Sequence, residues 1–163
     1  MSRTLDSNGP RRRTLALVVC TALGACLKAP EPPAPAQLTT TRSPGEVVQI
    51  ASRELTAAGF EIASTDAATG AVVARRVRTP NAHQTDVKCS FQRGSIADER
   101  AEASFVVRVN ARQESTGGSQ VEITSSVRTD RSNLPAPFKT GPNDKDCVST
   151  GAIEKRVADA LRQ

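Results

Sequence analysis

The chain is poor in aromatic and histidine side chains. Its 163 residues include four Phe and one His but no Trp or Tyr. Trp, Tyr and His provide much of the ring stacking, proton transfer and metal ligation in binding sites. The composition therefore argues against aromatic cages, haem pockets and multi-histidine metal centres, and we expect no cofactor. The length fits one domain with some residues left over.

Most of the chain also lacks an excess of positive charge, although the formal net charge is +5. Four of the 22 basic residues and one of the 17 acidic residues precede Cys26, which leaves 18 basic and 16 acidic residues beyond it. Nucleic-acid binding normally requires a clustered basic face. The nearly neutral remainder therefore predicts no nucleic-acid partner.

The basic residues near the N-terminus belong to a pattern typical of a signal peptide. Three consecutive arginines, Arg11 to Arg13, precede the apolar run LALVVCTAL at 15–23. This run is shorter than the roughly 20 residues that a membrane-spanning helix needs. We predict a signal peptide over residues 1–25, exported by either the general secretory or the twin-arginine route.

Residues 23–26 (LGAC) resemble the lipobox of bacterial lipoproteins, which has a branched residue, two small residues and then a cysteine. The resemblance implies that Cys26 receives a diacylglyceryl group on its sulfur, becomes the new N-terminus and is acylated on its amine. Cys20 follows two valines and does not fit the pattern. The alternative is an ordinary secretory signal that leaves Cys26 unmodified.

The implied lipid group would attach the protein to a membrane surface. Two or three acyl chains hold a protein on a bilayer essentially permanently without crossing it. In lipoproteins an Asp after the lipidated cysteine marks retention at the inner membrane, and here that position is Leu27. The resemblance therefore implies a lipid-anchored protein of the bacterial cell envelope, on the outer membrane, with its domain in the periplasm or at the surface.

Residues 26–42 are predicted to hold the lipidated cysteine and a proline-rich tether. Pro30, Pro32, Pro33 and Pro35 favour polyproline II at roughly 3.1 Å per residue, so the stretch could place a domain about 50 Å from the bilayer. Proline lacks a backbone donor, and no core is expected here. The alternative role is a ligand for a proline-recognising groove.

The folded domain is predicted to occupy residues 43–163 and to begin with a helix. Ser43 and Glu46 have the spacing of a capping box, with Pro44 at the first helical position. Apolar residues then recur at helical spacing until Gly59, where we expect the helix to stop. The apolar stripe favours packing in the core over docking on a partner helix, because a sheet follows directly.

Beyond Gly59 the apolar residues alternate, which indicates strands with one buried face. The predicted strands lie at 60–65, 71–77, 87–91, 103–112 and 121–127. A loop without periodicity follows at 128–148, and a final amphipathic helix starts after Ser149 or Thr150. We predict an α+β fold, in which an antiparallel sheet of about five strands carries the N-terminal and C-terminal helices on one face.

This order of elements is similar to that of small envelope lipoprotein domains, including the helix-grip domains of an outer-membrane assembly-factor lipoprotein. The residues that carry the similarity are Leu55, Gly59, Phe60, Asp66 and Gly70. The similarity implies an α+β accessory domain and no particular functional site.

Two cysteines remain once the predicted leader and the lipid have taken Cys20 and Cys26. Cys89 and Cys147 form an even pair in an oxidising compartment, which predicts a disulfide. Such a bridge would close a loop of nearly sixty residues and contribute about 4 kcal/mol through chain entropy. The alternatives are a redox-active pair or a metal site, although the chain has no C-x-x-C motif.

A basic run on one predicted strand forms a candidate anion-binding cluster with arginines of another strand. Its candidate residues are Arg75, Arg76, Arg78, Arg108 and Arg112. Either Arg75, or Arg76 together with Arg78, would share a face or edge of the sheet with the other two. The planar fork of arginine suits phosphate and carboxylate groups. The alternative is a solvated polar face balanced by Glu61 and Glu122.

The remaining candidates for chemistry are isolated polar residues. His83 lies in a polar loop, and Asp98, Glu99 and Glu102 form a charged loop without a motif that supplies catalytic partners. We predict a non-catalytic, membrane-anchored binding or assembly module whose partners are envelope proteins or anionic envelope polymers. The alternative is an envelope enzyme or enzyme inhibitor that acts through the 128–148 loop.

Overall fold

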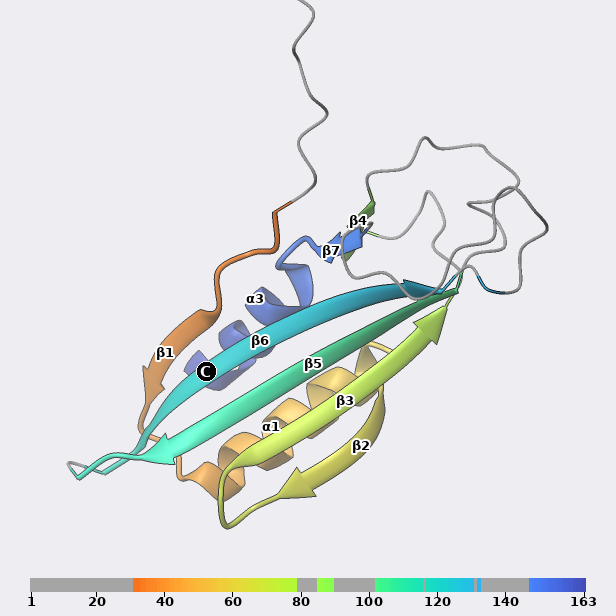
Figure 1. Cartoon of the computed structure of the whole chain (residues 1–163). Coiled ribbons are helices and arrows are strands. Elements are labelled where there is room, and N and C mark those ends of the chain that lie inside the picture. The colour runs from red at the N-terminus through yellow and green to blue at the C-terminus, as the bar shows by residue number, and fades with distance from the viewer. Residues whose placement is uncertain (1–30, 79–84, 90–101, 116, 131, 133–146) are drawn as a thin grey trace, which may run out of the picture.

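A five-stranded antiparallel sheet and two helices form the fold in a computed structural model of the chain (Figure 1). The structure describes residues 31–78, 85–89, 102–115, 117–130, 132 and 147–163. The elements are β1 (Ala36–Thr40), α1 (Pro44–Ala57), β2 (Glu61–Asp66), β3 (Ala71–Arg78), β4 (Val87–Cys89), β5 (Glu102–Gln113), β6 (Ser119–Asp130), β7 (Cys147–Ser149) and α3 (Ala152–Arg162). The strand order is β1-β6-β5-β3-β2, which confirms the predicted α+β class.

Helix α1 begins and ends where the sequence predicts. The backbone N–H of Ser43 donates to the Glu46 carboxylate at 2.8 Å, and the Ser43 hydroxyl accepts from the Glu46 N–H, which completes the capping box. The Ser43 hydroxyl also donates to the Glu46 carboxylate at 2.8 Å, and the two hydrogen bonds to the carboxylate, the backbone one first, lower the pKa of Glu46. At the other end Gly59 has a φ of 80°, and the N–H of Phe60 donates to the Leu55 carbonyl at 2.9 Å, as in a Schellman motif.

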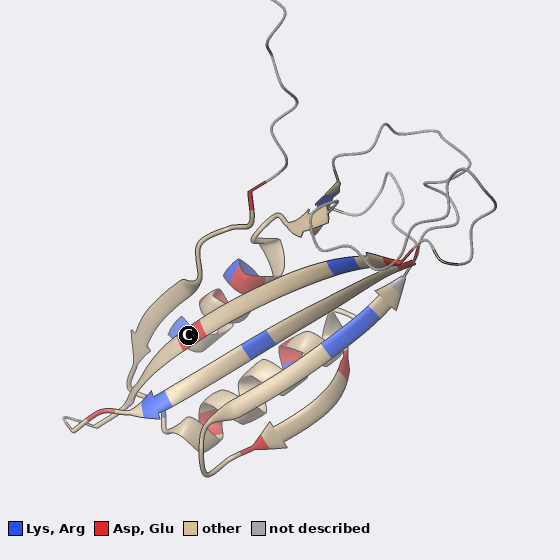
Figure 2. Ribbon diagram, viewed as in Figure 1, with Lys and Arg blue, Asp and Glu red and all other residues tan. Residues whose placement is uncertain are grey.

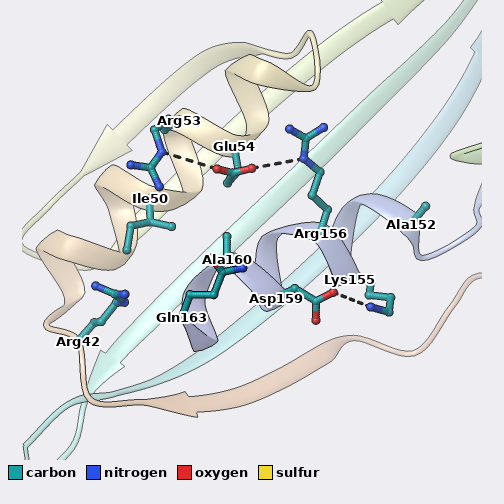
Figure 3. A pocket seen from close by; sticks show the side chains of 10 residues that line it. All are labelled: Arg42, Ile50, Arg53, Glu54, Ala152, Lys155, Arg156, Asp159, Ala160 and Gln163. Carbon is teal, nitrogen blue, oxygen red and sulfur yellow. Dashed lines mark hydrogen bonds and ion pairs between the residues drawn. The ribbon is translucent and has the colours of Figure 1, made fainter.

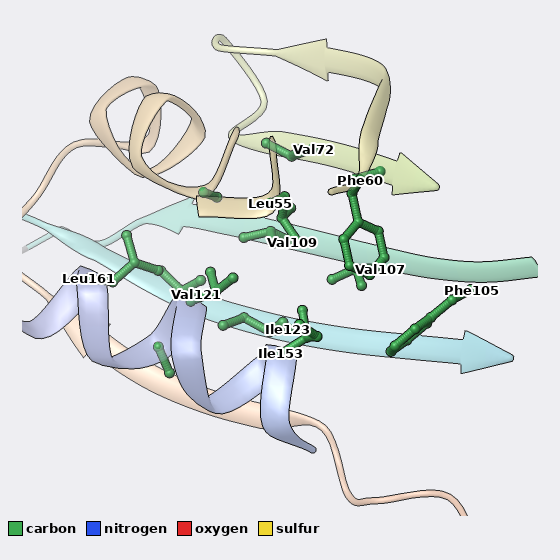
Figure 4. Close-up of a cluster of buried hydrophobic side chains, with 14 of the residues drawn as sticks. Leu55, Phe60, Val72, Phe105, Val107, Val109, Val121, Ile123, Ile153 and Leu161 are labelled. Atoms are coloured by element: carbon green, nitrogen blue, oxygen red, sulfur yellow. The ribbon is translucent and has the colours of Figure 1, made fainter. Parts of the chain in front are cut away.

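Both helices lie on the same face of the sheet, and the core fills the space between these layers (Figures 1 and 4). The largest fully buried side chains include Leu55 of α1, Leu161 and Val157 of α3, and Phe105, Val107, Val109, Val121 and Ile123 of the central strands. The core is mostly aliphatic, but the rings of Phe60 and Phe105 meet edge to face with centroids 5.2 Å apart.

The domain starts earlier than predicted, because the expected tether does not run to residue 42. Ala36–Thr40 form the edge strand β1, which pairs with β6 from Ala36 opposite Ile123 to Thr40 opposite Ser119. The last proline of the segment is Pro35, and strand pairing begins directly after it, where backbone donors are again available. Because prolines precede it, this short alternating strand was predicted to be part of the tether.

The strand around Cys89 is also not part of the main sheet. β4 and β7 form a separate two-stranded ladder in which Val87 lies opposite Ser149 and Cys89 opposite Cys147. The fifth place in the main sheet belongs to β1 instead. The start of α3 differs as well: Gly151 is the N-cap, while Ser149 lies in β7 and donates to the Glu154 carboxylate at 3.0 Å.

Candidate binding surface on the open face of the sheet

The face of the sheet opposite α1 and α3 is not covered by any described helix or strand (Figure 1). Buried and outward side chains alternate along β5, from buried Phe105 and Val107 to exposed Arg108 and Asn110. We call the outward surface of the three central strands the open face. Its residues are Val73, Arg75 and Val77 of β3, Ser104, Val106, Arg108, Asn110 and Arg112 of β5, and Gln120, Glu122, Thr124, Ser126 and Arg128 of β6.

Three of the five arginines of the predicted cluster share the open face. Arg108 and Arg112 are exposed on β5, and Arg75 on β3 lies opposite Val106, two residues along β5 from Arg108. Arg128 of β6 is a fourth arginine that the sequence analysis placed in a loop. That boundary was wrong, because β6 continues to Asp130, and the alternation of buried Val127 and Thr129 was the signal for it.

The register of the strands places the four arginines in an elongated band on the sheet, and Figure 2 shows the basic positions spread along β3, β5 and β6. Arg128 lies opposite Ser104 at one end of β5, and Arg112 lies near the other end. Because an antiparallel strand rises about 3.4 Å per residue, the band is about 27 Å long. The structure therefore places positive charge along the sheet and not in one pocket.

Arg76 does not belong to this band, and its predicted place in the anion-binding cluster is wrong. It points to the helix-covered face, with its side chain only 9% exposed, and forms an ion pair with Asp86. Its guanidinium lies 4.4 Å from the centroid of the Phe60 ring and 5.5 Å from that of Phe105. It also donates to the carbonyl of Ala58, at the end of α1, at 3.1 Å. These contacts give Arg76 a structural role.

In the described part of the chain, no carboxylate forms an ion pair with an arginine of the open face. Glu61 of β2 lies opposite Arg75, but the two side chains do not reach ion-pair distance. Glu122 and Arg112 line a small cavity of about 210 Å³ without a direct ion pair between them. Among the described residues, therefore, no carboxylate neutralises the guanidinium groups of the band.

One end of the open face is acidic. Glu102 lies opposite Asp130 where β5 begins and β6 ends. The pKa of Asp130 is lowered, first because the backbone N–H of Ser132 donates to it at 2.8 Å, and Arg128 nearby contributes as well. Glu102 and Asp130 limit the basic band on that side.

A larger cavity lies on the other side of the molecule, between α1 and α3 (Figure 3). It has a volume of about 740 Å³ and a charged lining. Glu54 pairs with Arg53 at 3.6 Å and with Arg156 at 3.3 Å, and Lys155 pairs with Asp159. Most charges of this groove therefore neutralise one another, unlike those of the open face.

The predicted disulfide between Cys89 and Cys147 is confirmed. The bond joins residues 58 positions apart, at the pair that β4 and β7 place directly opposite each other. Two hydrogen bonds also join the residues next to β4 and β7. The Thr150 hydroxyl donates to the Thr85 carbonyl at 2.7 Å, and the Thr150 N–H donates to the Asp86 carbonyl. The bridge thus fixes the small ladder beside α3.

Several predicted residues lie outside the described part of the chain. These are Cys20, Cys26, His83, Asp98, Glu99, the side chain of Arg78 and most of the 128–148 loop. Arg78 pairs through its backbone with Ala103. Within the described residues, no group of three or more His, Cys, Asp or Glu side chains could hold a metal ion.

Among the described helices, none is both long and apolar enough to cross a membrane. No protein-family model matches the chain, and no curated protein is significantly similar to it.

Proposed function

We propose that this protein is a lipid-anchored lipoprotein of the bacterial cell envelope whose domain binds a partner without catalysis. The open face is the observation that carries this proposal. It presents four arginines from three strands, and none of them pairs with a described carboxylate. A long row of unpaired guanidinium groups on a rigid sheet suits the recognition of phosphate or carboxylate groups.

The N-terminal sequence supports the anchor. The arginines at 11–13, the apolar run at 15–23 and the LGAC motif at 23–26 occur in the order that lipoprotein signal peptides require. Acylation of Cys26 would hold the domain at a membrane, on the outer membrane according to Leu27. The prolines before β1 would then separate the domain from the bilayer.

Photo-crosslinking in living cells tests the binding role of the open face. A photoreactive amino acid at Thr124, in the middle of the open face, should give adducts, whereas the same group at exposed Gln49 of α1 should give few. The double variant Arg75→Gln/Arg108→Gln should lower the yield at Thr124 at least about 5-fold, because each arginine near an anionic surface contributes about 1 kcal/mol.

The matched control is Arg53→Gln on α1, which removes one exposed arginine from the helix side. It should leave the adducts at Thr124 unchanged. Equal yields at Thr124 and Gln49, or yields that do not respond to Arg75 and Arg108, would contradict the proposal.

A further inference from the structure

We propose that the open face docks on the anionic phosphate surface of the bilayer that carries the protein's own lipid anchor. The proposal rests on the anchor proposed above and names the partner of the same face. Its basis is the juxtaposition of a basic sheet face with a short connection to Cys26.

The connection is shorter than the sequence alone predicts. Because β1 begins at Ala36, only residues 27–35 separate the sheet from Cys26. At roughly 3.1 Å per residue in polyproline II, nine residues would span at most about 28 Å, about half of the predicted reach. β1 is itself a strand of the sheet, and Gln37 lies opposite Glu122 of the open face. An anchor at Cys26 would therefore hold the sheet close to the headgroups.

The shape of the open face fits a flat array of phosphates. Its arginines are spread along about 27 Å of the strands, and the cavity at Arg112 and Glu122 holds only about 210 Å³. Arginine forms bidentate hydrogen bonds with phosphate oxygens. Tethering also raises the effective concentration of the headgroups, so that weak individual contacts suffice.

The side chains of the open face favour a bilayer over a glycan or a protein partner. Protein hot spots are enriched in Trp, Tyr and Arg, and of these the chain has only Arg. The two described phenylalanines, Phe60 and Phe105, are buried under the helices. Between the arginines the described open face offers polar and aliphatic side chains but no aromatic ring, and Val77 is 44% exposed. Such a surface can rest on headgroups but offers no ring on which a sugar could stack.

Removing an acidic side chain from the open face should strengthen the docking. Glu122 lies beside Arg112 and repels phosphate. The variant Glu122→Gln should therefore strengthen the contact, whereas Arg75→Gln/Arg108→Gln should weaken it up to about 25-fold, since each arginine accounts for about 5-fold. If the two variants change the strength of docking in opposite directions, the effect comes from charge and not from a general loss of structure.

Reconstituted vesicles test this proposal. The lipidated protein, purified with a photoreactive amino acid at Thr124 or at Gln49, is placed in phosphatidylcholine vesicles with or without phosphatidylglycerol. Mass spectrometry then measures the fraction of protein joined to phospholipid. With phosphatidylglycerol, and only then, we expect at least about 5-fold more lipid adducts from Thr124 than from Gln49. These adducts should be lost in Arg75→Gln/Arg108→Gln. Their yield should rise in Glu122→Gln.

The outcomes separate the two proposals. Lipidated protein that gives no phospholipid adduct at Thr124, or that gives a protein adduct there in cells, overturns membrane docking and leaves the anchored binding module. Equal lipid adducts in neutral and anionic vesicles also overturn docking through phosphate. Purified protein with an unmodified Cys26 overturns the anchor itself and the docking proposal with it.

Discussion

The variant Arg76→Met should lower the free energy of unfolding by about 3–5 kcal/mol. Asp86, with its side chain 12% exposed, would lose its charged partner, and the Ala58 carbonyl at the end of α1 would lose a donor. Leaving a buried carboxylate unpaired costs much more than a surface ion pair contributes. Urea unfolding followed by far-UV circular dichroism measures this change, since the chain has no Trp or Tyr for fluorescence.

The neighbouring residue on the same strand provides the control. Arg75 is exposed on the open face, and Arg75→Met should change the free energy of unfolding by no more than about 0.5 kcal/mol. The double variant Arg76→Met/Asp86→Leu should recover most of the loss, because no buried charge remains. A loss below about 1 kcal/mol for Arg76→Met would show that the pair does not hold the domain together.

The double variant Cys89→Ala/Cys147→Ala should lower the free energy of unfolding by about 4 kcal/mol. The bridge spans 58 positions, and its removal enlarges the set of conformations open to the unfolded chain. It would also release β4 and β7, whose ladder has only three residue pairs. The measurement is urea unfolding of the variant and of wild-type protein with and without a reductant.

Reduced wild-type protein is the matched control for the cysteine variant. It should unfold at the urea concentration that unfolds Cys89→Ala/Cys147→Ala, while the oxidised protein should need more. If oxidation changed the free energy of unfolding by less than about 1 kcal/mol, the bridge would not be a main support of the domain.

Much of the fold follows from local patterns in the sequence. The capping box of Ser43 and the left-handed Gly59 define α1 by short-range hydrogen bonds alone, and so they were predictable. The long strands β5 and β6 have one clear buried phase, which the alternation of their side chains shows. The disulfide followed from the count of cysteines left after the predicted leader and lipid.

The other features depend on contacts between distant residues. Both phases of β3 are apolar, with Val72 and Ala74 on one face and Val73 and Val77 on the other, so the sequence did not decide whether Arg75 or Arg76 faces outward. The helices that pack over Val72 determine which of the two faces of β3 is buried.

The ladder of β4 with β7 and the burial of Glu154 are further examples. Alternation around Cys89 predicts a strand but not the strand with which it pairs. Glu154 is only 3% exposed, and the hydroxyls of Ser125 and Ser149 satisfy its buried carboxylate by donating to it. These partners come from β6 and β7, and no local pattern relates them to α3.

The mass of the intact protein, purified from bacterial membranes without reductant, is the most direct test of the lipid anchor. We expect a chain that begins at Cys26, carries a diacylglyceryl group and a further acyl chain, and has no free thiol because Cys89 and Cys147 are joined. A chain with an unmodified Cys26, or one that begins at another residue, would contradict the lipid anchor and the binding role proposed for the open face at a membrane.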